Sequence, residues 1–167
     1  DGFTTYMMTP DKDYAQLVTE HIFMYKPGKS GTDNEIWGIE EVKKNFEIDT
    51  PQKVIDLLGL MGDASDNIPG CPGIGPKNAQ KLISDFGDID GIYRNLDQLK
   101  GKQKENLEEF ENQVRLSREL ATICLDVPVE FQPEKLRTEA PDQKALRELF
   151  RELEFRSLSE RLQLGQP

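Results

Sequence analysis

The chain has 167 residues, a length that suits one domain, or one domain with a fragment of another. Hydrophobic residues make up 36% and charged residues 31%, which predicts a modest core beneath a well-solvated surface. The 31 acidic residues outnumber the 21 basic ones, and the net charge of −10 disfavours phosphate binding unless acids bind metal and basic residues are grouped.

Nothing in the sequence predicts a membrane-bound, secreted or disulfide-rich protein. No apolar run approaches the ~18 residues that a membrane span requires, and no signal peptide opens the chain. Cys71 and Cys124 are far apart and lack metal-ligand spacing, so we expect two reduced thiols in a cytoplasmic protein. The chain starts at Asp1 without a methionine, which suggests a piece of a longer protein.

The first 48 residues predict the edge of an α/β sheet. A short buried strand over Thr4–Thr9 is followed by a helical turn over Tyr14–Val18. Two more strand candidates, over Ile22–Tyr25 and Glu35–Ile39, precede a short helix over Glu40–Phe46. Because only three strand candidates are present, we expect them to be the edge of a sheet whose earlier strands are missing from this chain.

The remainder of the chain has the pattern of an almost entirely helical region. Thr50 before Pro51 is typical of an N-cap followed by proline at the first helical position. The longest helical pattern covers Lys102–Thr122, and Pro141 with Asp142 opens a last amphipathic helix. We therefore predict an α+β, mostly α, fold that divides into residues 1–48 and residues 49–167. The other predicted helices cover residues 54–61, 76–86, 88–95 and 157–164.

Two acidic motifs predict a metal site. Asp11 and Asp13 follow a strand end, where α/β proteins place ligands. Asp63 and Asp66 are three residues apart, and on a helical turn they would share a face. Four carboxylates suit a hard cation such as magnesium, and cations of this kind assist phosphodiester hydrolysis. Spacing alone leaves a second interpretation open, in which these residues cap a helix and form solvated turns.

A glycine-rich turn predicts a phosphate-binding element. Gly73, Ile74 and Gly75 lie between two predicted helices, and Pro76 opens the second helix. Glycines allow a ligand to approach the backbone, and the amides at a helix start attract anions. Lys77 and Lys81 add positive charge one turn apart, whereas Ile74 is expected to pack between the helices. An ordinary tight turn between two helices is the alternative.

These residues carry a family resemblance. The run Leu57–Ala79 contains Gly-Asp-Ala-Ser-Asp-Asn-Ile-Pro-Gly followed by Gly-Ile-Gly, and it resembles the 5′-nuclease (flap endonuclease-like) family. Thr9–Leu17 and Leu153–Leu158 resemble further landmarks of the 5′–3′ exonuclease domain of bacterial DNA polymerase I. The resemblance covers nearly the whole chain.

The resemblance implies a role for each predicted site residue. It implies a PIN-like α/β sheet followed by a helical domain that carries a helix–three-turn–helix (helix-hairpin-helix-type) element. The four aspartates would form the second metal site of a magnesium- or manganese-dependent nuclease. Gly73, Ile74 and Gly75 would hold duplex DNA, and backbone carbonyls there would bind potassium. From charge and position, we expect Lys77 and Lys81 to contact phosphates.

The implied activity is hydrolysis of DNA phosphodiesters at 5′ ends and flaps, in primer removal, nick translation and excision repair. A polymerase domain of the same parent chain would be its partner, and we expect a monomer without membrane contacts. The family's first metal site uses acids from earlier strands, so we expect this chain alone to bind DNA without cutting it. The alternatives are a non-catalytic, structure-selective DNA-binding module and a helical protein-interaction domain.

Overall fold

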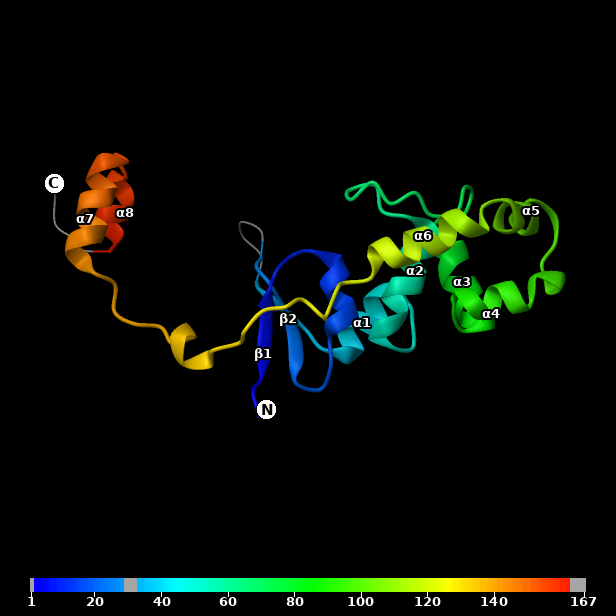
Figure 1. Cartoon of the computed structure of the whole chain (residues 1–167), viewed down its shortest axis with the longest axis horizontal. Helices are drawn as coiled ribbons and strands as arrows, with labels where there is room; N and C mark the ends of the chain where they lie inside the picture. Colours follow the sequence, from blue (N-terminus) through cyan, green and yellow to red (C-terminus); the bar gives the residue numbers. More distant parts are fainter. Residues whose placement is uncertain (1, 29–32, 163–167) are drawn as a thin grey trace. The chain divides into compact units, whose positions relative to one another are not determined.

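A computed structural model describes residues 2–28 and 33–162 of the chain. The chain divides into two compact units, Asp1–Leu125 and Asp126–Pro167. Three strands and most of the helices belong to the first unit (Figure 1). Within the described ranges, no helix combines the length and the apolar character needed to cross a membrane.

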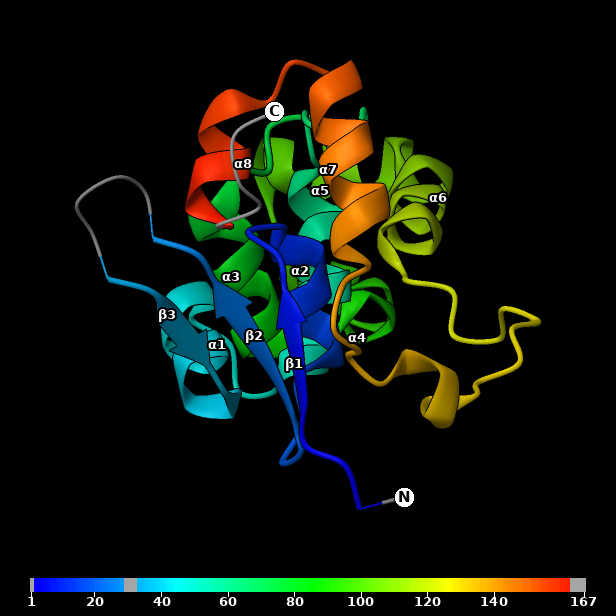
Figure 2. The ribbon, with the colours of Figure 1, turned by 90° about the vertical axis from the view of Figure 1, so that its left-hand side faces the viewer.

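The sheet of the first unit has the strand order β1-β2-β3, as Figure 2 shows. β1 (Thr5–Met8) pairs in parallel with β2 (Ile22–Lys26), and β2 pairs in antiparallel with β3 (Glu35–Trp37). A 3-10 helix, η1 (Lys12–Leu17), connects the two parallel strands. The three strands lie where they were predicted, except that β3 ends at Trp37 and Ile39 begins α1 instead of ending the strand. The predicted burial of the first strand was wrong, because β1 is an edge strand with mostly exposed side chains within the described sheet.

Helices make up most of the rest of this unit. The predicted single helix over 102–122 was wrong, because the chain bends at Phe110, which caps both α5 and α6. Phe110 packs against the helical core, so the bend allows Leu107 before it and Val114 after it to be buried together. The elements are α1 (Ile39–Phe46), η2 (Pro51–Lys53), α2 (Val54–Met61), α3 (Pro76–Phe86), α4 (Ile89–Arg94), η3 (Leu96–Gln98), α5 (Gly101–Glu109) and α6 (Glu111–Ala121).

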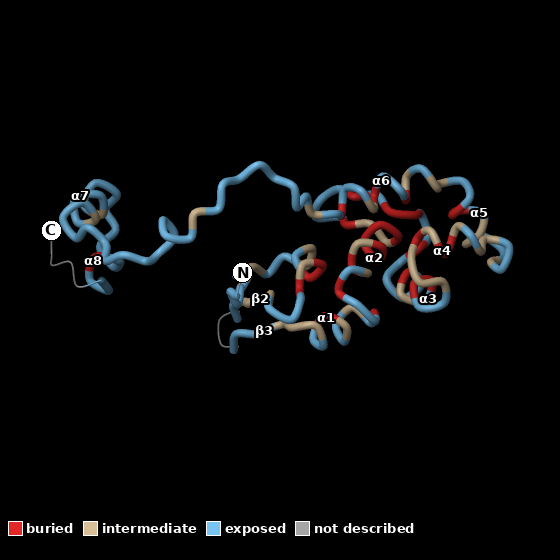
Figure 3. The backbone as a smooth tube through the Cα atoms, turned by 60° about the horizontal axis from the view of Figure 1, so that its bottom comes forward, coloured by how far each residue is buried: buried red, intermediate tan, exposed pale blue. Residues whose placement is uncertain are grey.

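Helix α2 lies at the centre of the first unit. Leu57 and Leu60 belong to a helical core with α3 to α6, whereas Leu58 belongs to a core beneath the sheet. Most of its side chains are apolar because other elements cover it on several sides, and its one charged residue, Asp56, is buried. Phe46 and Met61 pack against both cores, and buried segments gather along these helices in Figure 3. Packing against the helical core and against the core beneath the sheet therefore fixes the position of the C-terminus of α2.

The second unit contains η4 (Pro133–Leu136), α7 (Gln143–Glu152) and α8 (Arg156–Arg161). The Asp142 carboxylate accepts hydrogen bonds from the amides of Lys144 and Ala145, which confirms the predicted start of an amphipathic helix. Phe150 and Phe155 join the two helices, with ring centroids 5.8 Å apart. The end of the last predicted helix, residues 163–164, lies outside the described residues.

Candidate functional site

A tight loop follows α2 and carries two of the predicted acids. Helix α2 ends at Met61, and Gly62 then adopts a positive φ of 75°. Asp63 and Ile68 exchange backbone hydrogen bonds of 2.9 and 2.8 Å, which close the loop. A Cβ atom at position 62 would lie 2.6 Å from the Ile68 carbonyl oxygen, so only glycine fits. Asp63 and Asp66 therefore meet through a turn, and the predicted helical spacing was the wrong reason for their proximity.

Three of the four predicted carboxylates converge. Oxygens of Asp13, Asp63 and Asp66 lie within 4.8 Å of one another, one from η1 and two from the loop after α2. Asp63 is buried, Asp13 is half-buried and Asp66 is exposed, so the cluster is reachable from solvent. The Asp11 carboxylate instead accepts a 3.1 Å hydrogen bond from the Asp13 amide and caps η1 beside the cluster.

The electrostatics of the cluster favour a cation. Burial, followed by the neighbouring charges of Asp11, Asp63 and Asp66, raises the pKa of Asp13 to about 6. Its Oδ1 atom is buried without a hydrogen-bond partner in the described part of the chain. A buried carboxylate oxygen of this kind is costly unless a cation or donor satisfies it. The donor set, entirely oxygen, suits a hard divalent cation.

Asp63 has a different environment. Burial alone would raise the pKa of its carboxyl group, but hydrogen bonds from the Lys12 ammonium and from Ser65 outweigh burial and lower it. The Ser65 hydroxyl and amide reach Asp63 Oδ1 at 2.9 and 3.0 Å. Asp63 is therefore held ionised and in a fixed orientation at the floor of the cluster.

Gln16 supports the cluster and was not predicted. This buried side chain donates hydrogen bonds of 2.9 Å to the carbonyl groups of Asp13 and Ala121. It also accepts a 3.0 Å hydrogen bond from the Ile123 amide. Gln16 therefore ties the residues around Asp13 to the end of α6. A single glutamine within an apolar segment has no motif by which the sequence could reveal this contact.

The predicted phosphate-binding turn follows directly after the acidic loop. The Cys71 amide donates a 2.7 Å hydrogen bond to the Leu60 carbonyl, which returns the chain to the end of α2. Ile74 is only 4% exposed and belongs to the helical core, which confirms that it packs between the helices. Gly73 has a φ of 77°, and Gly75 is the N-cap residue of α3.

The outer side of this turn can receive an anion. The amides of Gly73 and Gly75 donate no hydrogen bond within residues 2–28 and 33–162. A Cβ atom at position 75 would meet nothing within 4 Å, so the surface above Gly75 is open. Lys77 and Lys81 are exposed one helical turn apart on α3, and neither forms an ion pair with a described residue. Open amides, a helix start and two such ammonium groups together suit a phosphate.

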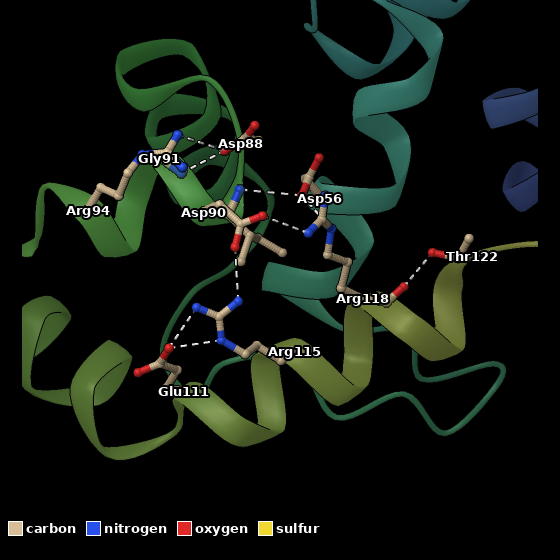
Figure 4. A network of polar contacts seen from close by, with 10 residues as sticks. Asp56, Asp88, Asp90, Gly91, Arg94, Glu111, Arg115, Arg118 and Thr122 are labelled. Carbon is tan, nitrogen blue, oxygen red and sulfur yellow. Dashed lines mark hydrogen bonds and ion pairs between the residues drawn. The ribbon is translucent and has the colours of Figure 1, made fainter.

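An ion-pair network joins α2, α4 and α6, as Figure 4 shows. Arg118 on α6 contacts Asp56 on α2 at 3.0 Å and Asp90 on α4 at 3.1 Å. Arg115 contacts Asp90 at 2.9 Å and Glu111 at 2.7 Å. Burial raises the pKa of Asp56, although the Arg118 charge opposes this effect. These arginines neutralise acids on neighbouring helices and are not free for phosphate binding.

Comparison with known proteins identifies the family. Residues 49–144, more than half of the chain, match the family described as 5'-3' exonuclease, C-terminal SAM fold. The chain belongs to this family. The match confirms the predicted 5′-nuclease assignment, and it spans α2, the acidic loop, the glycine turn and α3 to α6.

The relatives of this chain within the 5'-3' exonuclease family are longer proteins. DNA polymerase I of Bacillus subtilis is 40% identical over 163 residues, which is 97% of this chain and 18% of the polymerase. The 5'-3' exonuclease of Aquifex aeolicus is 34% identical over 157 residues, 94% of this chain and 52% of that protein. The chain thus spans about a fifth of the first relative and about half of the second.

Solved structures of nucleases share the fold. The 5'-exonuclease of bacteriophage T5 with zinc ions bound aligns with a TM-score of 0.59 and 28% identity, over 70% of this chain and 42% of that chain. The T5 flap endonuclease in a complex with DNA and metal ions aligns with a TM-score of 0.59 and 27% identity, over the same shares of the two chains. The catalytic core of Rad2 with DNA has a TM-score of 0.55 at 19% identity over 86% of this chain and 50% of that chain, which shows the fold alone. These likenesses confirm the predicted mostly helical α+β fold.

Proposed function

We propose that this chain forms the DNA-holding and second metal-binding part of a 5′–3′ exonuclease or flap endonuclease. The main support is the position of the acidic loop and of the predicted phosphate-binding turn, which follow one another in the segment between α2 and α3. The backbones of Gly62 and Gly70 are in such close contact that a Cβ atom on Gly70 would overlap the Gly62 amide nitrogen. A phosphate held at the turn would therefore have a fixed relation to the acids.

Asp13, Asp63 and Asp66 are the proposed ligands of a magnesium or manganese ion, with Asp11 beside them. The convergence of their oxygens and the buried, unsatisfied Asp13 Oδ1 support this assignment. When bound, such a cation supplies an activated water and stabilises charge on the phosphate. The residues of the chain fix the position of the cation and, through Lys12 and Ser65, keep Asp63 ionised.

The proposed DNA contacts are the backbone of Gly73, Ile74 and Gly75 and the ammonium groups of Lys77 and Lys81. Contacts of this kind read the phosphate backbone and not the base sequence, which suits nicked, flapped or 5′-ended duplexes. We also propose that backbone carbonyls of the same turn bind a potassium ion. The chain is proposed to be a monomer, with a domain boundary between residues 48 and 49. The polymerase relatives support action beside a polymerase domain in replication and repair.

A second candidate function is structure-selective DNA binding without cleavage. Three convergent carboxylates are about as many as one cation uses as ligands, whereas a centre with two metal ions needs further acidic residues. The open amides at the turn would serve this function equally well. Cleavage of a flap substrate by this chain in magnesium would exclude it.

Gly75→Ala tests the DNA-binding proposal. The backbone φ of Gly75 is −89°, and its surroundings are open, so alanine leaves the fold intact. The added methyl group would lie where a phosphate approaches, and we expect at least tenfold weaker binding of labelled flap DNA at low salt. Fluorescence anisotropy measures the affinity, and the unfolding temperature serves as the control. Equal affinity of the variant and the unmodified chain would overturn the proposal.

A further inference from the structure

Three polar side chains from α5 and α6 hold the inner side of the turn. The Asn106 amide group donates a 2.7 Å hydrogen bond to the Pro72 carbonyl. The Gln113 amide group donates a 2.8 Å hydrogen bond to the Gly70 carbonyl. The Ser117 hydroxyl oxygen accepts a 3.0 Å hydrogen bond from the Gly70 amide. These contacts join segments 34, 43 and 47 residues apart in the sequence.

The burial of these groups indicates that they serve the turn. Ser117 is fully buried and Asn106 is 9% exposed, next to the apolar core residues Leu107 and Val114. A polar side chain in such a place costs stability unless its hydrogen bonds are made. For these side chains, the bonds are made to the backbone of residues 70–72.

The contacts lie directly beneath the two functional features of the loop. A Cβ atom on Gly73 would lie 3.0 Å from the Asn106 amide nitrogen, so Asn106 sets the path of the chain just before Gly75. Gln113 and Ser117 both bind Gly70, which packs on Gly62 at the start of the acidic loop. The three side chains therefore determine where the outward amides point relative to the acids.

We propose that Asn106, Gln113 and Ser117 are positioning residues for phosphate binding, an inference that rests on the proposed DNA-binding function. Their side-chain hydrogen bonds are to the backbone of Pro72 and Gly70. Asn106 fixes the Pro72 carbonyl next to Gly73, and Gln113 and Ser117 fix Gly70 at the start of the same turn, whose Gly73 and Gly75 amides would face the phosphate. Without one of these hydrogen bonds the turn could adopt other directions, and its amides would no longer meet the phosphate.

Asn106→Ala and Gln113→Ala test this inference, with Asn95→Ala as the matched control. Asn95 also donates an amide hydrogen bond, of 2.8 Å, to the carbonyl of Gly91, but it lies at the end of α4. We expect about tenfold weaker flap-DNA binding for the two test variants and unchanged binding for the control. The slope of log affinity against log salt should change little, because neither variant removes a cationic side chain.

A measurement without DNA separates positioning from simple loss of stability. In proton–nitrogen spectra, the amide signals of Gly73 and Gly75 should shift in the test variants and stay in place in Asn95→Ala. If Asn106→Ala does not fold, Gln113→Ala decides, because Gln113 is only half-buried. If the unmodified chain binds flap DNA and Gln113→Ala has the same affinity and spectrum, the positioning role is wrong but the proposed function stands. If the unmodified chain binds no flap DNA, the proposed function and the inference fail together.

Discussion

The carboxyl group of Asp13 is the most perturbed acid of the cluster, and its raised pKa has a consequence for cation binding. Because its pKa is about 6 in the folded chain, it is largely protonated below that pH and ionised above it. A cation must displace this proton at acidic pH. We expect manganese affinity to be constant above about pH 7 and to fall as the pH drops through 6, toward tenfold per pH unit.

Calorimetric titration with manganese between pH 5 and 8 measures this dependence. Asp13→Asn is the control, because its side chain keeps the shape of aspartate but cannot ionise. The variant should bind weakly, without the step near pH 6. A flat affinity for the unmodified chain across pH 5 to 7 would contradict the assignment of Asp13 as a ligand.

At the residue scale, the structure brings together three of the four predicted acids, but through a different local geometry from the one that the spacing predicted. Asp63 and Asp66 were expected to meet on a helix, but they meet across a turn that Gly62 makes possible. The contacts of Lys12 with Asp63 and of Gln16 with Asp13 depend on which elements pack together. A local pattern contains no signal for such tertiary contacts.

At the scale of elements, the ion-pair network joins α2, α4 and α6. Removing Arg118 would leave the buried Asp56 carboxylate without its ion-pair partner. Arg118 is itself about one-third exposed, so solvent screens part of the interaction. We expect Arg118→Ala to lower the free energy of unfolding by about 1–3 kcal/mol.

Urea denaturation of Arg118→Ala and of Arg94→Ala measures this difference. Arg94 makes only a peripheral 3.9 Å contact with Asp88 and is 70% exposed, so its removal should cost less than about 0.5 kcal/mol. Equal stability of the two variants would show that the network contributes nothing specific. Double substitution of Asp56 and Arg118 by apolar residues should recover part of the loss.

The elements themselves were largely predictable because their signals are local. Thr50 before Pro51 and Asp142 before α7 were recognised as helix starts, although only Asp142 makes a side-chain capping hydrogen bond. The division of the long helix at Phe110 was missed, because the apolar period continues through the bend. Packing of Phe110 against the core decided the division, and this information is not contained in the helical period.

At the scale of the whole molecule, a net charge of −10 opposes DNA binding, so the proposed affinity depends on the local surface around the turn. Lys77 and Lys81 contribute positive charge at this surface. We expect the double substitution Lys77→Ala and Lys81→Ala to weaken flap-DNA binding more than tenfold. The salt slope should fall by about 1.8, or about 0.9 for each phosphate that is no longer neutralised.

The matched control is the double substitution Lys44→Ala and Lys135→Ala. Both lysines are exposed and form no ion pair with a described residue, and their removal changes the net charge by the same amount. If binding at the turn governs affinity, the control should weaken affinity by less than about threefold, through long-range repulsion alone. Equal decreases in the two double variants would mean that net charge governs binding, and Lys77 and Lys81 would then have no special role. A large decrease confined to the first pair would show that a small basic surface beside open backbone amides overcomes the charge of the entire chain.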